Sequence, residues 1–337
     1  MIRFLISFLI LTNWTSSADF KGEVNVYSHR HYEIDKKIFE RFTEKTEIKV
    51  NVVKANADQL IKRLEIEGQN SPADVLITVD AGRLFRAKQK GLLQPIESKI
   101  LNENIPAHLR DPEGYWHGLS MRARVIAYSK DRVDPRELST YEDLTDKKWQ
   151  GRILVRSSQN IYNQSLLASM IASKGPEKAK DWAQGIVANL ARKPKGNDRD
   201  QIKAIAAGIG DVAIVNTYYI GKMLNSENPA ERRVAKMVDL FFPNQNGRGT
   251  HINVSGAGVT AHAAHKKHAV KFLEYLVSEE AQKLFAEANY EYPVGQDVER
   301  GSLVRSWGDF KADDINLSLL GQHNRQAVEI FDEVGWR

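Results

Sequence analysis

The chain contains no cysteine among its 337 residues. Disulfide frameworks and thiolate metal centres are therefore excluded, and an exported form of the chain must be stabilised by burial alone. The excess of positive charge is small: 48 basic residues against 43 acidic ones give a net charge of +5, and the two signs are interspersed in stretches such as KKIFERFTEK. This mixture is typical of solvated helix faces and differs from the basic stripe of nucleic-acid-binding proteins, so we expect no nucleic-acid partner.

Long apolar runs are scarce too, and the one that stands out lies at the start of the chain. In MIRFLISFLILTNWTSSADF, Arg3 precedes an apolar run over residues 4–11, and small residues follow at 16–18. This order is typical of a secretory signal peptide, and the run is shorter than a membrane span requires. We therefore expect residues 1–18 to be removed and the exported chain to begin near Asp19. An uncleaved anchor is the alternative.

Strand and helix patterns alternate after this leader. Residues 23–28 and 48–54 alternate like strands, and residues 73–80 form a more continuous apolar run. Between them, residues 33–45 and 57–68 carry apolar side chains at helical spacing. This βαβαβ order predicts a largely parallel sheet with helices on its faces.

A second series of strands and helices follows the first. Residues 117–129 have the pattern of a long strand that could cross between two lobes. Residues 268–289 have the pattern of an amphipathic helix, interrupted near Ser278, which can cap a new helix start. Further strands are predicted over residues 151–158, 208–216 and 252–263.

Two such series predict an α/β protein of two lobes with a cleft between them. We expect the first lobe to comprise residues 19–119 with about 255–310, and the second lobe residues 120–254. Residues 311–337 are expected to form a C-terminal helical segment. Ligands of open α/β sheets lie beyond the carboxyl ends of the strands, which is where functional residues should be sought.

Four of the eleven tyrosines lie where a predicted strand gives way to a helix. These junctions carry His31 and Tyr32 (SHRHYEI), Tyr162 (SSQNIYNQ), and the adjacent pair Tyr218 and Tyr219 (VNTYYIG). Neighbouring side chains on a helix point about 100° apart, so the adjacent pair cannot share one buried face. In the first turn of a helix, both can instead overhang the cleft. For each tyrosine alone, ordinary packing with its hydroxyl in water is the alternative.

A cluster of phenols suits a hard trivalent metal ion. Phenol is protonated at neutral pH because its pKa lies near 10, but a highly charged cation stabilises the phenolate, a hard oxygen donor. Helix N-termini favour the anion further. Zinc, calcium and magnesium fit less well, because thiolates are absent and Glu33 is the nearest carboxylate to these junctions. The pattern therefore favours Fe(III).

The charge of such a site calls for a nearby cation. Four phenolates around Fe(III) leave one negative charge, which a buried site has to balance. The stretch MRARV supplies Arg122 and Arg124, which alternate along the predicted strand, so we expect only one of them, Arg122, to face the cleft. Ordinary surface or hinge positions are the alternative for both. Fe(II) would leave two negative charges, so we expect it to bind more weakly or to leave one phenol protonated.

The stretches SHRHY, QNIY and NTYY, in that order, resemble the periplasmic ferric-iron-binding proteins of bacterial ABC iron importers. The likeness extends over almost the whole chain after the leader. It implies a transferrin-like, two-lobed periplasmic-binding-protein fold of a type II-like kind. That fold has two mixed sheets flanked by helices, a hinge and an interlobe cleft. It also implies a periplasmic monomer that carries one iron ion to an ABC-transporter permease.

The resemblance assigns roles to particular residues. Tyr32, Tyr162, Tyr218 and Tyr219 match the tyrosine ligands, His31 matches a histidine that some members use, and Arg122 matches an arginine near the iron. Some members also bind carbonate. Having His31 and Tyr32 in the first lobe is more typical of a tyrosine-rich subgroup, so the sequence leaves carbonate open. His29 is a neighbour that could be confused with His31, which we prefer because it adjoins Tyr32.

Two other classes of function compete with iron binding. The same scaffold carries polyamines, thiamine or inorganic anions, for which tyrosines could stack on rings or face cations. An exported enzyme is disfavoured, because the sequence has no nucleophile elbow, no HExxH motif and no paired catalytic carboxylates. His262, His265 and His268 recur every three residues and could bind adventitious metal, but we expect them to be solvated surface residues.

Overall fold

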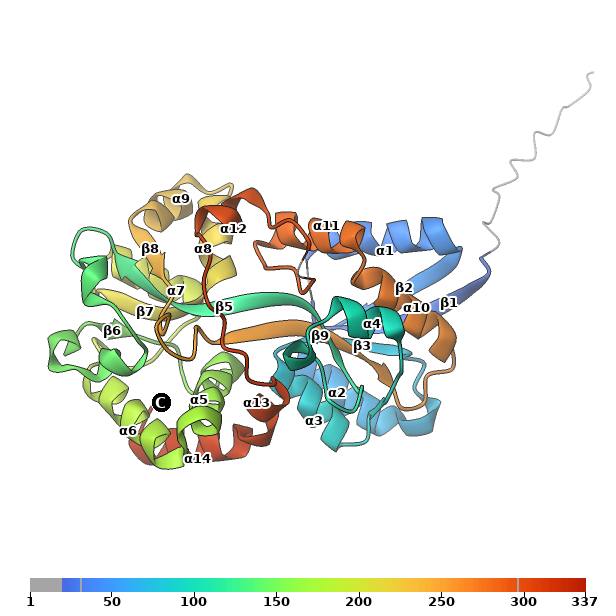
Figure 1. Ribbon diagram of the computed structural model, residues 1–337, viewed down its shortest axis with the longest axis horizontal. Helices are drawn as coiled ribbons and strands as arrows, with labels where there is room; N and C mark the ends of the chain where they lie inside the picture. Colours follow the sequence, from blue (N-terminus) through green and yellow to red (C-terminus); the bar gives the residue numbers. More distant parts are fainter. Residues whose placement is uncertain (1–19, 31, 296) are drawn as a thin grey trace, which may run out of the picture.

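The computed structural model describes residues 20–30, 32–295 and 297–337. The predicted signal peptide and His31 lie outside the described residues. Among the described residues, no helix combines the length and the apolar character needed to cross a bilayer. Figure 1 shows two lobes side by side, with long strands running from one to the other.

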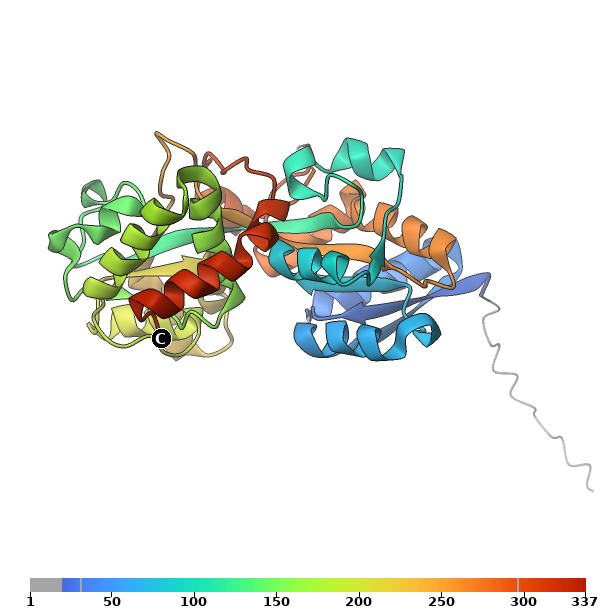
Figure 2. The ribbon, with the colours of Figure 1, turned by 90° about the horizontal axis from the view of Figure 1, so that it is seen from below.

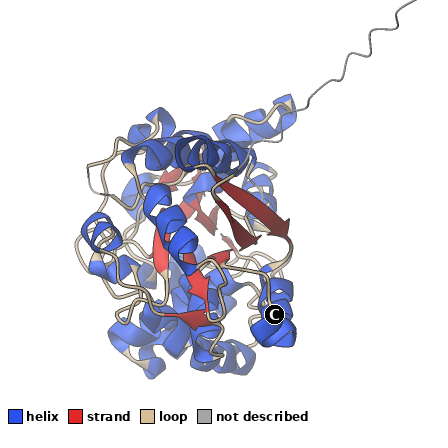
Figure 3. Cartoon of the chain, turned by 90° about the vertical axis from the view of Figure 1, so that its right-hand side faces the viewer, coloured by secondary structure: helices blue, strands red, loops and turns tan. Residues whose placement is uncertain are grey.

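The strands and helices alternate along the chain, much as the sequence predicts. The strands are β1 (Gly22–Ser28), β2 (Ile48–Lys54), β3 (Val75–Val79), β4 (Leu93–Gln94), β5 (His117–Ser129), β6 (Ile153–Leu154), β7 (Val212–Asn216), β8 (Val238–Phe241) and β9 (Ile252–Thr260). The helices are α1 (Glu33–Thr46), α2 (Ala57–Glu67), α3 (Ala81–Gln89), α4 (Lys99–Asn104), α5 (Ile161–Lys174), α6 (Pro176–Ala188), α7 (Asp198–Ala206), α8 (Thr217–Leu224), α9 (Pro229–Lys236), α10 (Lys266–Leu276), α11 (Glu279–Asn289), α12 (Ser302–Ser306), α13 (Ser318–Gln322) and α14 (Asn324–Val334). Figure 3, which looks along the molecule, shows the helices surrounding the strands.

The sheet of each lobe is mixed, and β5 belongs to both. The strands follow the order β2-β1-β3-β9-β5-β7-β6, with β4 beside β9 and β8 beside β5. In the first lobe β1 is parallel to β2 and β3, whereas β9 is antiparallel to β3. Residues 117–123 of β5 pair with β9, and residues 124–128 pair with β7. The predicted crossing strand and the two-lobed fold with mixed sheets are therefore confirmed.

Two apolar cores lie on opposite faces of the second sheet. Along β5, Val125 and Ala127 belong to the larger core, which continues into the first lobe, whereas Ile126 and Tyr128 belong to a smaller core. Successive side chains of a strand point to opposite faces, so a fully buried strand such as β7 can contribute to both cores. Helices therefore cover both faces of the strands that position the site.

The C-terminal helices connect the two lobes. The short helix α13 contacts both α3 of the first lobe and α5 of the second, and α14 packs on α5 and α6. Figure 2 shows α14 lying along the second lobe, with α13 near the junction. Gly321 of α13 lies against Phe85 of α3, and a Cβ atom placed on this glycine would come within 2.3 Å of the phenylalanine side chain. The approach of α13 to α3 therefore depends on glycine.

One predicted strand is much shorter than expected. Residues 151–158 were predicted as a strand, but only Ile153–Leu154 pair with β7. The chain turns after them because the side-chain amide of Asn163 donates to the carbonyl oxygens of Arg156 and Ser157, at 2.8 and 3.3 Å. The strand predicted over residues 252–263 likewise ends at Thr260.

Candidate metal centre

Four phenol rings from three separate junctions converge where the lobes meet. The Tyr218 hydroxyl donates to the Tyr162 hydroxyl at 3.4 Å. The ring centroids of Tyr218 and Tyr219 lie 4.2 Å apart at an angle of 32°. Tyr32, from the first lobe, lies within electrostatic range of Tyr162 and Tyr218. Across the junction, the Lys222 ammonium lies 3.9 Å from the centroid of the Tyr32 ring. The structure thus brings together all four tyrosines that the sequence singled out.

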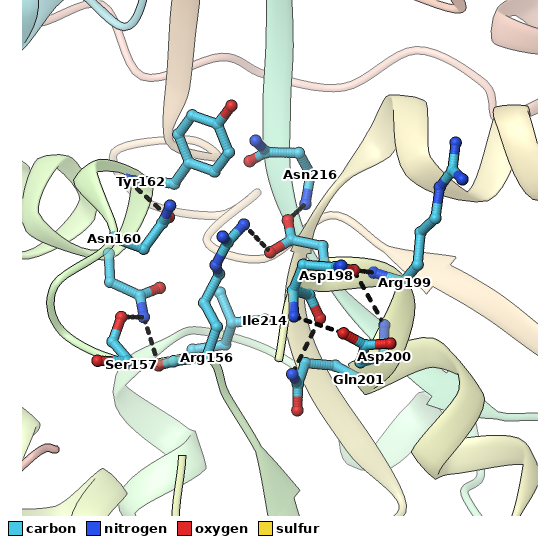
Figure 4. A network of polar contacts seen from close by, with 12 residues as sticks. Arg156, Ser157, Asn160, Tyr162, Asp198, Arg199, Asp200, Gln201, Ile214 and Asn216 are labelled. Atoms are coloured by element: carbon cyan, nitrogen blue, oxygen red, sulfur yellow. Dashed lines mark hydrogen bonds and ion pairs between the residues drawn. The ribbon is translucent and has the colours of Figure 1, made fainter. Parts of the chain in front are cut away.

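Helix starts hold these tyrosines at the site. Tyr162 lies in the first turn of α5, where the Asn160 side chain accepts a hydrogen bond from its N–H at 3.0 Å, as Figure 4 shows. Tyr218 and Tyr219 lie in the first turn of α8, and Tyr32 is the residue immediately before α1. Helix N-termini carry partial positive charge, so three of them near one point favour a negatively charged site.

Burial favours the neutral form of three of these phenols, those of Tyr32, Tyr218 and Tyr219. Desolvation is the largest cause that raises the pKa of Tyr32, Tyr218 and Tyr219. For Tyr32 the next cause is the nearby carboxylate of Glu291, and for the other two it is Tyr162. Deprotonation therefore requires a cation at the centre, which a phenolate-binding metal would supply.

Both arginines of β5 contact the cluster, so the expectation that only Arg122 faces the cleft is wrong. Arg122 and Arg124 are each 2% exposed. Their guanidinium carbons lie 5.9 Å from the ring centroids of Tyr218 and Tyr162, respectively. Residues two apart on a strand share a face, and this period makes the two arginines neighbours at the site. Asn216 immediately precedes α8, but its side chain makes no capping hydrogen bond and accepts from Arg124 at 3.0 Å.

A buried carboxylate neutralises part of this positive charge. Glu291 is fully buried and accepts from Arg122 at 2.6 Å and from the Ser120 hydroxyl at 2.7 Å. Arg30 lies 3.7 Å from the same carboxylate and is paired with Asp35 at 3.2 Å. Burial alone would raise the pKa of Glu291, but Arg122 and Arg30 hold it below its usual value.

Sequence reasoning missed several charged residues at this centre: Arg30, Arg156, Asp198, Lys222 and Glu291. Lys222 could have been found, since it lies four residues after Tyr218 on the same helix. Burial is the largest cause that lowers its pKa, to about 8. Glu291 gave no local signal, because its partner Arg122 is 169 residues away.

The predicted histidines have different outcomes. His31 lies outside the described residues, and one ring nitrogen of His29 lies 3.4 Å from the carbonyl oxygen of Ala55. His265 and His268 were expected to be solvated surface residues, but both are only partly exposed. Their Nδ1 atoms contact the Asp74 carboxylate at 3.0 Å and the Glu23 carbonyl oxygen at 2.9 Å. His262 is exposed.

The chain has two α/β lobes joined by crossing strands, and polar side chains from both lobes gather at their junction. This combination is that of the bacterial solute-binding proteins. Residues 70–310 match the family described as bacterial extracellular solute-binding protein, and the chain belongs to that family. The chain is 51% identical over 315 residues to iron uptake protein A1 of Synechocystis, covering 94% of this chain and 88% of that protein. It is 24% identical over 334 residues to the major ferric iron-binding protein of Neisseria meningitidis, covering 98% of each.

Solved structures support the same relationship. The Trichodesmium protein IdiA (FutA), in complex with iron and citrate ligands, is 54% identical to this chain with a TM-score of 0.92. The match covers 94% of this chain and all of that one. A ferric-binding protein from Campylobacter jejuni is 47% identical with a TM-score of 0.88, covering 93% of this chain and all of that one. The predicted resemblance to periplasmic ferric-iron-binding proteins is confirmed.

Proposed function

We propose that this chain binds ferric iron between its two lobes, in the periplasm, and delivers it to an ABC-type permease of the inner membrane. The relatives named for iron uptake and ferric iron binding support this proposal. The observation that carries it is the convergence of four phenols from both lobes, with the hydroxyls of Tyr218 and Tyr162 3.4 Å apart. Such a centre has the donor chemistry of a hard trivalent metal ion.

The proposed ligands are Tyr32, Tyr162, Tyr218 and Tyr219, with His31 as a further candidate. Arg122 would act next to the ligands as a charge-balancing residue. Among the described residues near the rings, five cations face three carboxylates: Arg30, Arg122, Arg124, Arg156 and Lys222 against Asp35, Asp198 and Glu291. This surplus of two positive charges offsets the single negative charge of Fe(III) with four phenolates. Fe(II) would bind more weakly, and carbonate is not required for this balance.

The proposed activity is a cycle of binding and release, without turnover. Tyr162, Tyr218 and Tyr219 lie on the second lobe, so they would capture iron first. Bending at the crossing strands β5 and β9 would then bring Tyr32 from the first lobe onto the metal. The closed form, as one monomer, would be what the permease recognises. Acid would assist release, because protons compete with the metal for phenolate.

Colour tests this proposal directly. Iron–phenolate bonds absorb visible light, so the purified protein loaded with ferric iron should be yellow to red, with one iron per chain by metal analysis. Protein that stays colourless and takes up no iron would contradict the proposal. Binding of a polyamine, thiamine or an inorganic anion by such colourless protein would establish the alternative solute instead.

A further inference from the structure

Asp198, the first residue of α7, is a buried carboxylate that joins separate parts of the second lobe. Its side chain is fully buried. It accepts hydrogen bonds from Arg124 Nη1 at 3.2 Å, Arg156 Nη1 at 3.1 Å and the Asn216 backbone N–H at 2.9 Å. Figure 4 shows Asp198 between Arg156 and Asn216, with dashed lines to both. One carboxylate thus fixes two arginines and the end of β7.

Each of these donors leads to a tyrosine of the candidate metal centre. The guanidinium carbons of Arg124 and Arg156 lie 5.9 and 5.5 Å from the ring centroid of Tyr162. Asn216 immediately precedes α8, whose first turn carries Tyr218 and Tyr219. Asp198 is therefore linked to three of the four phenols without contacting their hydroxyls.

Arg124 strengthens the same connection. Its Nη2 donates to the Asn163 side-chain oxygen at 2.6 Å, next to Tyr162, and its Nη1 also donates to the Asn216 side-chain oxygen at 3.0 Å. A guanidinium presents its donors in a rigid planar fork, so a carboxylate that fixes the plane also fixes where the positive charge lies.

We propose that Asp198 is a positioning residue that sets the charge beside the phenols and thereby the preference of the centre for Fe(III) over Fe(II). The inference rests on the proposed function. Arg124, Arg156 and Asp198 together carry one net positive charge beside Tyr162. Removing the carboxylate charge would leave two, and extra positive charge disfavours the more highly charged ferric ion. In a buried site such a charge acts with little screening by water.

The chain offers a matched control in Asp211. Like Asp198, it accepts from two arginines of the same lobe, from Arg132 Nε at 2.6 Å and from Arg152 Nε at 2.7 Å. Neither of these arginines contacts the rings of the four tyrosines in the described structure. Asp211→Asn therefore removes a carboxylate that is likewise paired with two arginines, at a less buried position away from the proposed iron environment.

The test is a redox titration of the iron-loaded Asp198→Asn and Asp211→Asn proteins, together with thermal unfolding. We expect Asp198→Asn to lower the ratio of ferric to ferrous affinity about tenfold, a rise of about 59 mV in the one-electron potential. Asp211→Asn should leave the potential unchanged even where it lowers the unfolding temperature. A potential that is unchanged in Asp198→Asn, or shifted equally in both variants, would overturn the inference.

Arg156→Gln supplies a second variant, in case Asp198→Asn does not fold. It removes a positive charge from the same cluster, so it should raise the ratio of ferric to ferrous affinity and lower the potential. This change is opposite in direction to that expected for Asp198→Asn. No shift, or a shift of the same sign, would refute the inference. A wild-type protein that binds no iron would refute the proposed function itself, which separates the two failures.

Discussion

Single phenol oxygens can be removed from the candidate centre while their rings remain. In Tyr218→Phe and Tyr219→Phe the two adjacent rings remain, and one proposed metal ligand is lost in each case. Loss of a mere supporting partner of a metal ligand costs about 10–100-fold in affinity, so loss of the ligand itself should weaken Fe(III) binding by at least about 100-fold. Competition against a ferric chelator at equilibrium measures this change.

Tyr275→Phe is the matched control for these variants. Its hydroxyl is buried and has no hydrogen-bond partner among the described residues, so its removal leaves no other polar group unpaired. We expect wild-type iron affinity and an unchanged visible spectrum. If Tyr218→Phe and Tyr219→Phe also retain wild-type affinity, the proposed ligand set is wrong.

The tyrosines could be predicted from the sequence because each lies at a junction that is visible locally. A strand pattern ends, a helix pattern begins, and Tyr162 or the Tyr218–Tyr219 pair stands between them. The charges around them could not be predicted in the same way. Asp198 lies 74 residues from Arg124, and only the folded topology brings the two together. The period of a strand, applied correctly, would have placed Arg124 beside Arg122.

Among the strands and helices, those with a long apolar pattern could be predicted from the sequence, whereas the short strand β6 could not. The ranges predicted for β2 and β5 agree with the structure, because alternation over seven or more residues fixes a strand well. The break near Ser278 was also predicted, and its side chain accepts from the Ala281 N–H at the start of α11. The strand β6 is shorter than predicted because the Asn163 side-chain amide donates to the backbone of Arg156, seven residues before it, and this turn is not visible in the apolar pattern.

Helix α5 also meets the first lobe, through Asp80 at the start of α3. The fully buried Asp80 carboxylate accepts from the Ser165 hydroxyl at 2.8 Å and from the Asn253 amide of β9 at 2.8 Å. Its φ of 79° lies in the region that favours glycine, a strain that persists only where surrounding contacts impose it. One residue thus joins α3, the crossing strand β9 and α5.

Ser165→Ala should therefore favour opening of the lobes. A buried acceptor that loses a donor costs about 1–3 kcal/mol, and water can replace the donor only when the lobes separate. We expect iron release to a chelator to accelerate about tenfold, with a larger radius of gyration of the iron-free protein in X-ray scattering. Ser173→Ala is the control, since its hydroxyl donates to Met170 and accepts from Arg248, and neither contact involves α3 or β9. Equal release rates in the two variants would rule out this role.

For the whole molecule, buried histidines link stability to pH. His117 and His251 are 1% and 2% exposed, and each has an Nδ1 atom without a hydrogen-bond partner among the described residues. Burial, the largest cause, lowers the pKa of His117 to about 4 and that of His251 well below its usual value. The unfolded chain binds these protons near pH 6.5, whereas the native protein does not.

The sign of the effect follows from this difference. The free energy of unfolding has its full value above pH 6.5, where these histidines are neutral in both states. It decreases as the pH falls toward 4, by up to about 1.4 kcal/mol per pH unit for each histidine. We therefore expect each of the two histidines to lower the free energy of unfolding by about 2 kcal/mol at pH 5 relative to pH 7. Burial raises the pKa of Asp80 and of Asp313, and both oppose this loss at the acid end.

Urea unfolding of the iron-free protein between pH 7 and 5 measures how steeply the free energy of unfolding changes with pH. A chelator in the buffer removes any contribution from metal release. The change with pH depends on histidines that stay neutral in the native state. His117→Gln and His251→Gln should therefore each reduce the slope by about 1.4 kcal/mol per pH unit, whatever their effect on the free energy of unfolding at pH 7. His262→Gln, at an exposed position, should leave the slope as it is. A double variant at positions 117 and 251 that retains the full wild-type slope would assign the acid sensitivity to other groups.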